Sequence, residues 1–213
     1  MIRHVQIYIV TVVTLAFLAA AGPASAEPSH SATETIRGAI NNIMSVIKDP
    51  GINNPDTRPG LLGQVEDIAY TVFDFEEFSA RTVGPHWRSF SADQKSRFND
   101  AFADLLRALY VDKLEGYGGE NVEFVKEIKS TKGDKAEVQT TVQLKDKLVP
   151  VSYRLLIKQD AWKVYDVIIE QMSLVENYRG QFKEIIAQND AEALIARVEA
   201  KAEEIRLQNA VGK

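Results

Sequence analysis

Cysteine is absent from this chain of 213 residues. Without a thiol, the protein forms no disulfide, offers no thiolate to a metal ion and carries no lipid anchor attached through cysteine. Its stability therefore comes from packing alone, and a single domain of this length buries about 70% of the surface that its unfolded chain exposes.

Histidine is nearly as scarce, with three residues in the chain. Beyond residue 26 only His30 and His86 remain, and they do not form the closely spaced pairs that zinc sites use. The sequence also lacks G-x-S-x-G, P-loop and G-x-G-x-x-G motifs. These absences predict a protein that is not an enzyme and that holds no metal and no cofactor.

Basic clusters are missing as well. The chain has 25 Lys and Arg against 30 Asp and Glu, a net charge of −5, and no cluster of four or more basic residues. Nucleic acid and anionic membrane surfaces are therefore poor electrostatic partners.

The start of the chain has the pattern of a secretory signal. Arg3 precedes an apolar stretch over residues 5–21, which Gly22 and Pro23 interrupt and Ala24-Ser25-Ala26 closes. We expect residues 1–26 to be a signal peptide cleaved after Ala26, which leaves 27–213 as a single exported domain. An uncleaved membrane anchor is the alternative, because about 17 apolar residues just span a bilayer.

Apolar residues recur at helical spacing in six segments. Ser91 with Gln94 and Ser173 with Glu176 have the spacing of capping boxes, which mark helix starts. Pro and Gly at residues 50–51 and 84–85 mark helix ends. We expect helices over residues 36–48, 61–72 and 75–83, an irregular segment over 53–60, and further helices after residues 91, 173 and 190.

After Gly116 the apolar period falls from 3.6 to 2, which indicates strands. Four are expected, over residues 122–128, 135–144 and 149–157 and from Trp162 onward, joined by turns short enough for hairpins. In the last strand, Trp162, Val164, Asp166 and Ile168 are expected to share one face. The pattern predicts an α+β fold: a curved, antiparallel, four-stranded sheet with helices packed on one face.

Two segments carry a resemblance to a known family. Residues 162–182, WKVYDVIIEQMSLVENYRGQF, change from a strand to a capped helix, and residues 73–117 contain an F-D-F element, a Gly near Trp-Arg and a helix ending in a Tyr-rich turn. In these features the chain resembles the MlaC, or toluene-tolerance, family: the periplasmic phospholipid-binding component of an ABC lipid-transport system. The likeness extends over about residues 36–200.

This resemblance implies a cone of the nuclear-transport-factor type, in which sheet and helices enclose an apolar lipid pocket. It implies a monomeric, soluble periplasmic carrier that buries the acyl chains of a phospholipid and maintains outer-membrane lipid asymmetry. The implied partners are an inner-membrane ABC complex and an outer-membrane lipoprotein and porin complex. A hopanoid-type lipid is the alternative cargo.

Candidate lipid-lining residues are the apolar side chains expected on inward faces, and each has an ordinary core role as its alternative. They are Phe75, Phe78, Phe98, Phe102, Leu106, Tyr110, Val138, Val151, Tyr153, Leu155, Val164 and Ile168. Tyr178 and Arg179 match an N-Y-R element of the family, which places them at a lipid head group or a docking surface. The alternative for Arg179 is a surface pair with Glu176 or Asp166.

Two other functions stay open from the sequence, because a sheet covered by amphipathic helices encloses either a solid core or a cavity. One is a periplasmic protein-interaction module with a filled core. The other is a cone-fold isomerase or hydratase that uses Asp166, if this carboxyl group faces an apolar pocket near Tyr153. A structural Asp166, bonded to an arginine or to backbone groups, is the opposing interpretation.

Overall fold

The computed structural model describes residues 30–111, 121–144, 147–188 and 190–211. The expected signal peptide over residues 1–26 and the expected turn at Lys145 and Asp146 lie outside these ranges. The six helices of the described ranges are α1 (Ala32–Ile47), α2 (Arg58–Val72), α3 (Phe75–Val83), α4 (Ala92–Leu106), α5 (Leu174–Gln188) and α6 (Ala191–Val211). Two short 3₁₀ turns, η1 (Pro50–Asn53) and η2 (Gly84–Ser89), and a π-helical turn, η3 (Arg107–Val111), connect them.

Side-chain caps fix most of the helix starts, as the sequence predicts. Ser91 and Gln94 form a complete capping box at α4, and the hydroxyl group of Ser173 accepts a hydrogen bond from the Glu176 N–H. Helix α2 begins at Arg58, earlier than expected, because Pro59 occupies its first turn, where a missing N–H group removes no helical hydrogen bond.

The sheet is antiparallel throughout, in the order β1-β2-β3-β4-β5. Its strands are β1 (Val122–Lys129), β2 (Lys135–Leu144), β3 (Lys147–Lys158), β4 (Ala161–Ile169) and β5 (Met172–Ser173). The prediction of four strands is therefore wrong by one short strand. Glu170 and Gln171 both have positive φ angles, 49° and 70°, so the chain reverses in two residues and pairs once more with β4 before α5 begins.

Strand β4 contains a β-bulge at Tyr165, because Arg154 pairs with Asp166 whereas the next residue, Leu155, pairs with Val164. A bulge adds one residue and shifts the alternation of side chains. Trp162, Val164, Val167 and Ile169 consequently share the inner face, and the expectation that Asp166 and Ile168 lie on that face is wrong. A prediction that assigns alternate residues to opposite faces of the strand does not detect the inserted residue.

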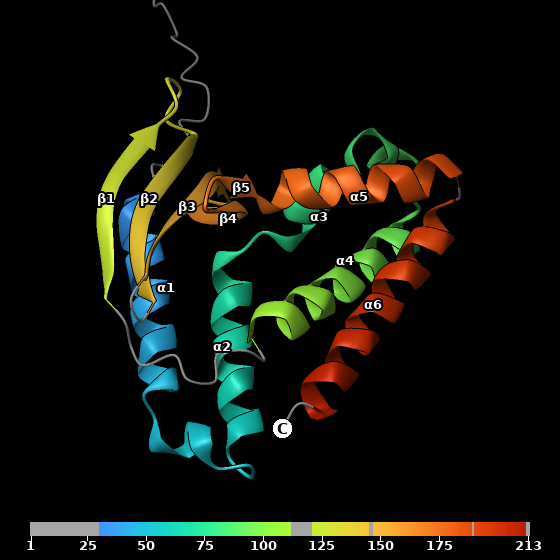
Figure 1. Cartoon of the computed structure of the whole chain (residues 1–213). Helices are drawn as coiled ribbons and strands as arrows, with labels where there is room; N and C mark the ends of the chain where they lie inside the picture. Colours follow the sequence, from blue (N-terminus) through green and yellow to red (C-terminus); the bar gives the residue numbers. More distant parts are fainter. Residues whose placement is uncertain (1–29, 112–120, 145–146, 189, 212–213) are drawn as a thin grey trace, which may run out of the picture.

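Most of the buried apolar residues belong to one of two clusters. The sheet core lies between α1 and the inner face of the sheet and comprises Ala32, Ile36, Ala136, Val138, Leu155, Trp162, Val164 and Val167. The helical core joins α3, α4, α5 and α6 and contains Phe78, Val83, Phe90, Phe98, Ala101, Phe102, Leu105, Ala108, Val175, Tyr178, Phe182, Ile186, Leu194, Ile195, Val198, Ala202 and Ile205. Figure 1 shows the sheet and α1 on one side, α4 and α6 on the other, and α2 between them.

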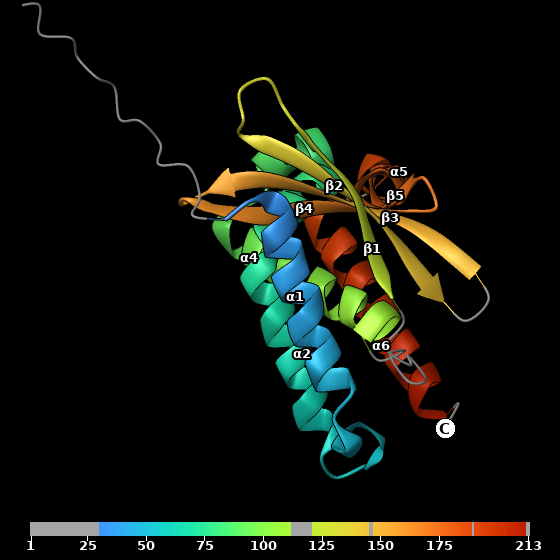
Figure 2. The same cartoon turned by 90° about the vertical axis from the view of Figure 1, so that its left-hand side faces the viewer.

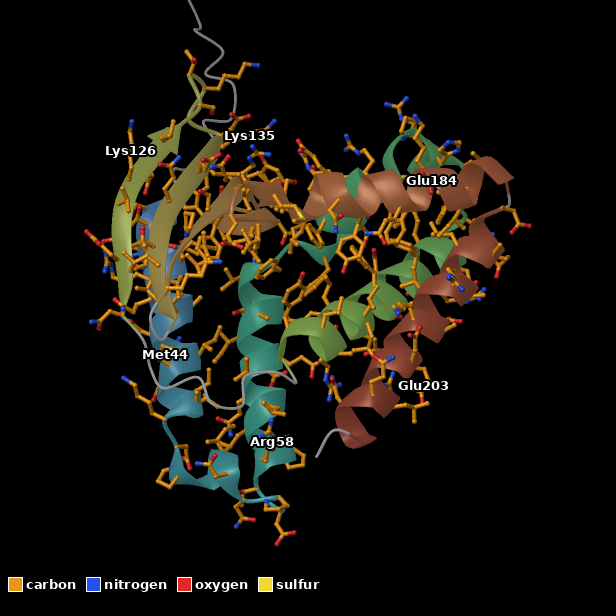
Figure 3. The ribbon with its side chains drawn as sticks, in the orientation of Figure 1. Met44, Arg58, Lys126, Lys135, Glu184 and Glu203 are labelled. Atoms are coloured by element: carbon orange, nitrogen blue, oxygen red, sulfur yellow. The ribbon has the colours of Figure 1, made fainter. Side chains whose placement is uncertain are left out.

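Helices α1 and α2 lie side by side along the inner face of the sheet (Figure 2). Leu174, at the start of α5, packs against both cores and is one point at which they meet. The outer surfaces are charged: Lys126, Lys135, Glu184 and Glu203 are exposed on the sheet, α5 and α6 (Figure 3).

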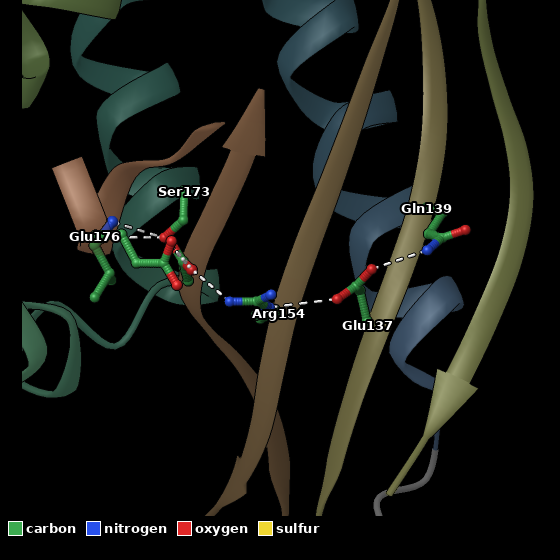
Figure 4. Close-up of polar contacts among 7 residues, drawn as sticks. Glu137, Gln139, Arg154, Ser173 and Glu176 are labelled. Carbon is green, nitrogen blue, oxygen red and sulfur yellow. Dashed lines mark hydrogen bonds and ion pairs between the residues drawn. The ribbon is translucent and has the colours of Figure 1, made fainter. Parts of the chain in front are cut away.

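Figure 4 shows the polar contacts between Glu137 and Arg154 on the sheet and between Ser173 and Glu176 at the start of α5. Asp166 ties these two groups together on the outer face of the sheet. It is 2% exposed, and its Oδ2 accepts from the Ser173 hydroxyl at 2.8 Å while its Oδ1 accepts from the Val175 N–H at 3.1 Å. Arg154 donates from Nη1 to Asp166 and from Nε to Glu137, both at 3.3 Å. These contacts make Asp166 a structural carboxylate that holds α5 on the sheet.

Replacing Asp166 tests this connection. We expect Asp166→Ala to lower the free energy of unfolding by about 2 to 3 kcal/mol, because the Val175 N–H and the Ser173 hydroxyl lose a charged acceptor. Asp56→Ala, in an exposed turn, is the control and should stay within about 0.5 kcal/mol of wild type. Equal losses for both variants in urea unfolding would contradict the assignment.

The helical core also makes stability depend on alkaline pH. Burial, and to a smaller extent Tyr110, raises the pKa of the Tyr178 hydroxyl above its usual value of 10. Since the folded-state pKa exceeds the unfolded one, this contribution is complete below about pH 10 and is lost as the pH rises above it. We expect Tyr178→Phe to reduce the fall in unfolding free energy above pH 10 by up to about 1.4 kcal/mol per pH unit. Urea unfolding at a series of pH values measures this, and a slope as steep as wild type would contradict it.

Candidate functional site

A cavity of about 470 Å³ lies between the two cores. The helices contribute Ile40, Ile43, Met44 and Ile47 from α1, Glu66, Ala69 and Tyr70 from α2, Phe75 and Phe78 from α3, Ala103 and Leu106 from α4 and Leu174 from α5. Phe73, Arg107 and Tyr110 come from the connecting segments, and Val122, Val142, Val149, Val151, Tyr153, Val167 and Ile169 from the sheet. Figure 3 labels Met44 on α1, one of the helices that form this wall.

The cavity exists because the large side chains on either side of it are engaged elsewhere. The rings of Phe98 and Phe102 pack against each other at a tilt within the helical core, with centroids 5.6 Å apart. On the walls themselves, Ala69 and Ala103 leave room that larger residues would fill. A cavity of this size falls within the range of about 300–1,000 Å³ that ligand sites have, and apolar walls favour an apolar ligand.

Six of the twelve residues predicted to contact lipid tails line this cavity. They are Phe75, Phe78, Leu106, Tyr110, Val151 and Tyr153. They come from α3, the end of α4, the π-helical turn η3 and the middle of β3.

The other six predicted residues lie elsewhere. Phe98 and Phe102 belong to the helical core, and Val138, Leu155 and Val164 lie in the sheet core with Ala32 and Ile36 of α1. Ile168 is on the outer face because of the bulge in β4. All six are apolar, as the cavity residues are. The apolar character of a residue in the sequence therefore does not distinguish a core position from a position on the cavity wall.

Several wall residues were missed by sequence reasoning. The α1 residues Ile40, Ile43 and Met44 were visible as a helical stripe, but nothing in the spacing says that this stripe continues past the sheet core to a cavity. Val167 and Ile169 were assigned to the wrong face for lack of the bulge.

Tyr178 and Arg179 are not part of the cavity wall. Tyr178 is 6% exposed in the helical core, where its ring meets Phe102 edge-on with centroids 4.9 Å apart. Arg179 is exposed, and its Nε donates to the backbone carbonyl of Arg81 at 2.8 Å. Of the alternative partners expected for Arg179, Asp166 is bound to Ser173 and Arg154 instead, and Glu176 donates its backbone N–H to the Ser173 hydroxyl.

The cavity opens to solvent beside four polar side chains. Tyr70 is 49% and Tyr110 44% exposed, and Arg107 Nη1 lies 3.5 Å from Glu66 Oε2. Loss of solvation, followed by the charge of Glu66, raises the pKa of the Tyr70 hydroxyl, and loss of solvation raises that of Tyr110. Both phenols are therefore neutral hydrogen-bonding groups at neutral pH.

None of the helices in the described ranges has the length and apolar character needed to cross a bilayer. In the same ranges, no group of three or more His, Asp or Glu side chains is placed to hold a metal ion.

Fold and cavity together define a class: α+β proteins in which an antiparallel sheet and its covering helices enclose an apolar cavity open to solvent at a polar rim. Residues 37–200 match the model of the MlaC protein family. The chain belongs to the MlaC family, and the resemblance seen in the sequence is confirmed.

The chain is similar to a known transport protein and to a solved structure. The intermembrane phospholipid transport system binding protein MlaC of Haemophilus influenzae is 23% identical over 165 residues, which are 76% of this chain and 73% of that protein. The structure of a phospholipid-binding protein from Ralstonia solanacearum in complex with a phospholipid matches with a TM-score of 0.73 and 23% identity. That match covers 83% of this chain and 99% of the other, and it confirms the α+β fold.

Filling the cavity should reduce its capacity for apolar ligands. We expect Val151→Trp to lower the affinity for a fluorescent fatty acid about tenfold, because the indole occupies volume that the alkyl chain needs, at a stability cost below about 3 kcal/mol. Val125→Trp is the matched control, since Val125 is 60% exposed and is not part of the wall. Fluorescence titration and thermal unfolding measure both variants, and wild-type affinity in folded Val151→Trp would contradict the role of this wall.

Proposed function

We propose that this protein is a periplasmic carrier that holds the acyl chains of a phospholipid in the cavity between its two cores. The observation that carries the proposal is the cavity itself, with walls supplied by every layer of the fold and almost wholly apolar. Membership of the MlaC family and the phospholipid named for the Ralstonia solanacearum structure support it.

The energetics of the tails determine how such a carrier operates. At about 0.8 kcal/mol per methylene, two tails with some thirty carbons would lose on the order of 20 kcal/mol on entering water. Spontaneous release is therefore very slow. Cargo leaves when the carrier docks on a partner that offers a continuous apolar path.

The proposed route follows from the family. The signal peptide over residues 1–26 directs export and is cleaved after Ala26, and the domain over residues 27–213 carries lipid as a monomer. It exchanges lipid with an inner-membrane ABC complex and an outer-membrane lipoprotein and porin complex, which maintains outer-membrane lipid asymmetry. The carrier uses no cofactor and performs no catalysis.

The structure weakens the two alternatives. An interaction module with a filled core does not account for a cavity of about 470 Å³. An isomerase would need the Asp166 carboxyl group in that cavity, whereas it lies on the outer face and binds Ser173, Val175 and Arg154.

Lipid extraction tests the proposal. Protein purified without detergent should yield close to one phospholipid per chain in mass spectrometry, because tails buried to this extent do not leave during purification. An interaction module would yield none and an enzyme only a small fraction. Lipid-free protein that also takes up no phospholipid from vesicles would contradict the proposed function.

A further inference from the structure

Among the residues that the structure describes, two charged side chains belong to the cavity wall, and they have opposite signs. Glu66 comes from the middle of α2 and Arg107 from the first position of η3. Their side chains are 25% and 45% exposed, so they lie where the cavity meets solvent rather than in its apolar interior.

The pair is loosely joined. Arg107 Nη1 and Glu66 Oε2 are 3.5 Å apart, whereas a charge-assisted hydrogen bond between such groups measures about 2.8 Å. Within the described ranges, Glu66 is the one ionic partner of the Arg107 guanidinium. Both groups therefore retain donor or acceptor capacity for a ligand.

The backbone at Arg107 is unusual. Residues 107–111 form a π-helical turn directly after α4, and such turns are rare and recur at functional sites. This turn carries Arg107 and Tyr110 to the wall, opposite Glu66 and Tyr70 on α2.

We propose that Glu66 and Arg107 recognise the head group of a zwitterionic phospholipid, such as phosphatidylethanolamine. This inference rests on the proposed function. The planar guanidinium group binds the phosphodiester, and the carboxylate binds the ammonium group. Tyr70 and Tyr110 line the same cavity and supply neutral hydroxyl groups.

Charge around the opening supports a zwitterionic rather than an anionic head group. Asp100 and Asp104 act on Tyr70 together with Glu66, and Arg206 lies 3.8 Å from Asp104. Arg107 is available to the phosphate of either lipid, but the glycerol of a phosphatidylglycerol head group brings no cation to Glu66 and the neighbouring carboxylates. An ethanolamine head group brings its own ammonium group to the acidic side.

Loading from mixed vesicles tests the assignment. Lipid-free protein is incubated with vesicles that contain equal amounts of phosphatidylethanolamine and phosphatidylglycerol, and the bound lipids are quantified by mass spectrometry. We expect wild type to take up phosphatidylethanolamine in about fivefold preference, the size of effect that partly exposed charge pairs produce. Glu66→Gln should bring the ratio close to one, and Glu66→Lys should favour phosphatidylglycerol.

Glu192→Lys is the matched control. Glu192 pairs with Arg97 at 2.9 Å near the start of α4 and is not part of the wall, so its reversal should leave the wild-type ratio unchanged. The amount of lipid per chain tests the carrier function, and the ratio of the two lipids tests the head-group assignment. Normal lipid per chain with the same ratio in wild type and folded Glu66→Lys overturns the head-group assignment and leaves the carrier intact. No bound lipid in wild type overturns the carrier function and, with it, this inference.

Discussion

The large apolar side chains of this protein are used in two separate cores, and the remainder of the structure depends on that division. The helical core takes Phe98, Phe102 and Phe182, and the sheet core takes Trp162 under α1. Neither set reaches across the space between them, so the walls of that space consist of aliphatic residues together with aromatic residues from α2, α3, β3 and the connecting segments. The cavity is the consequence of this partition and not of a defect in packing.

Such a cavity is costly when nothing fills it. At about 24 cal/mol per Å³, an empty and closed space of this size would destabilise the fold by on the order of 10 kcal/mol, which is comparable to the whole stability of a typical domain. A bound alkyl chain restores the missing contacts, and a ligand that binds only the folded state stabilises it further. Stability and cargo binding are therefore linked through the same apolar walls.

The hydrogen bonds of Asp166 have a related role at the opposite face of the sheet. They fix the start of α5, whose Leu174 packs against both cores and lines the cavity. The fixed start of α5 therefore holds the two cores apart, although they do not pack against each other along the cavity. A rigid frame of this kind is what a carrier needs if its cavity is to persist while lipid enters and leaves.

Much of the fold was predictable from local signals. Capping at Ser91, the stop at Gly84 and the alternation in β2 and β3 depend on neighbouring residues, and the structure agrees with each. The bulge at Tyr165 and the two-residue strand β5 were not predictable, because one extra residue and a tight turn leave little trace in periodicity.

For a different physical reason, only six of the residues that line the candidate site were predicted from the sequence. A buried Phe102 and a cavity-lining Phe78 look alike in sequence, since both lie on the apolar stripe of a helix. What separates them is the arrangement of the two cores in space. The polar rim at Glu66 and Arg107 was missed because opposite charges on two helices far apart in sequence resemble an ordinary surface pair.

A crystal structure of the protein purified without detergent tests the central claim most directly. The account predicts continuous tubular electron density in the cavity between the two cores, in contact with Met44 and Val151, with the head group at the opening beside Arg107. Walls that close on each other, with side chains packed through that space and no density for an alkyl chain, would contradict it.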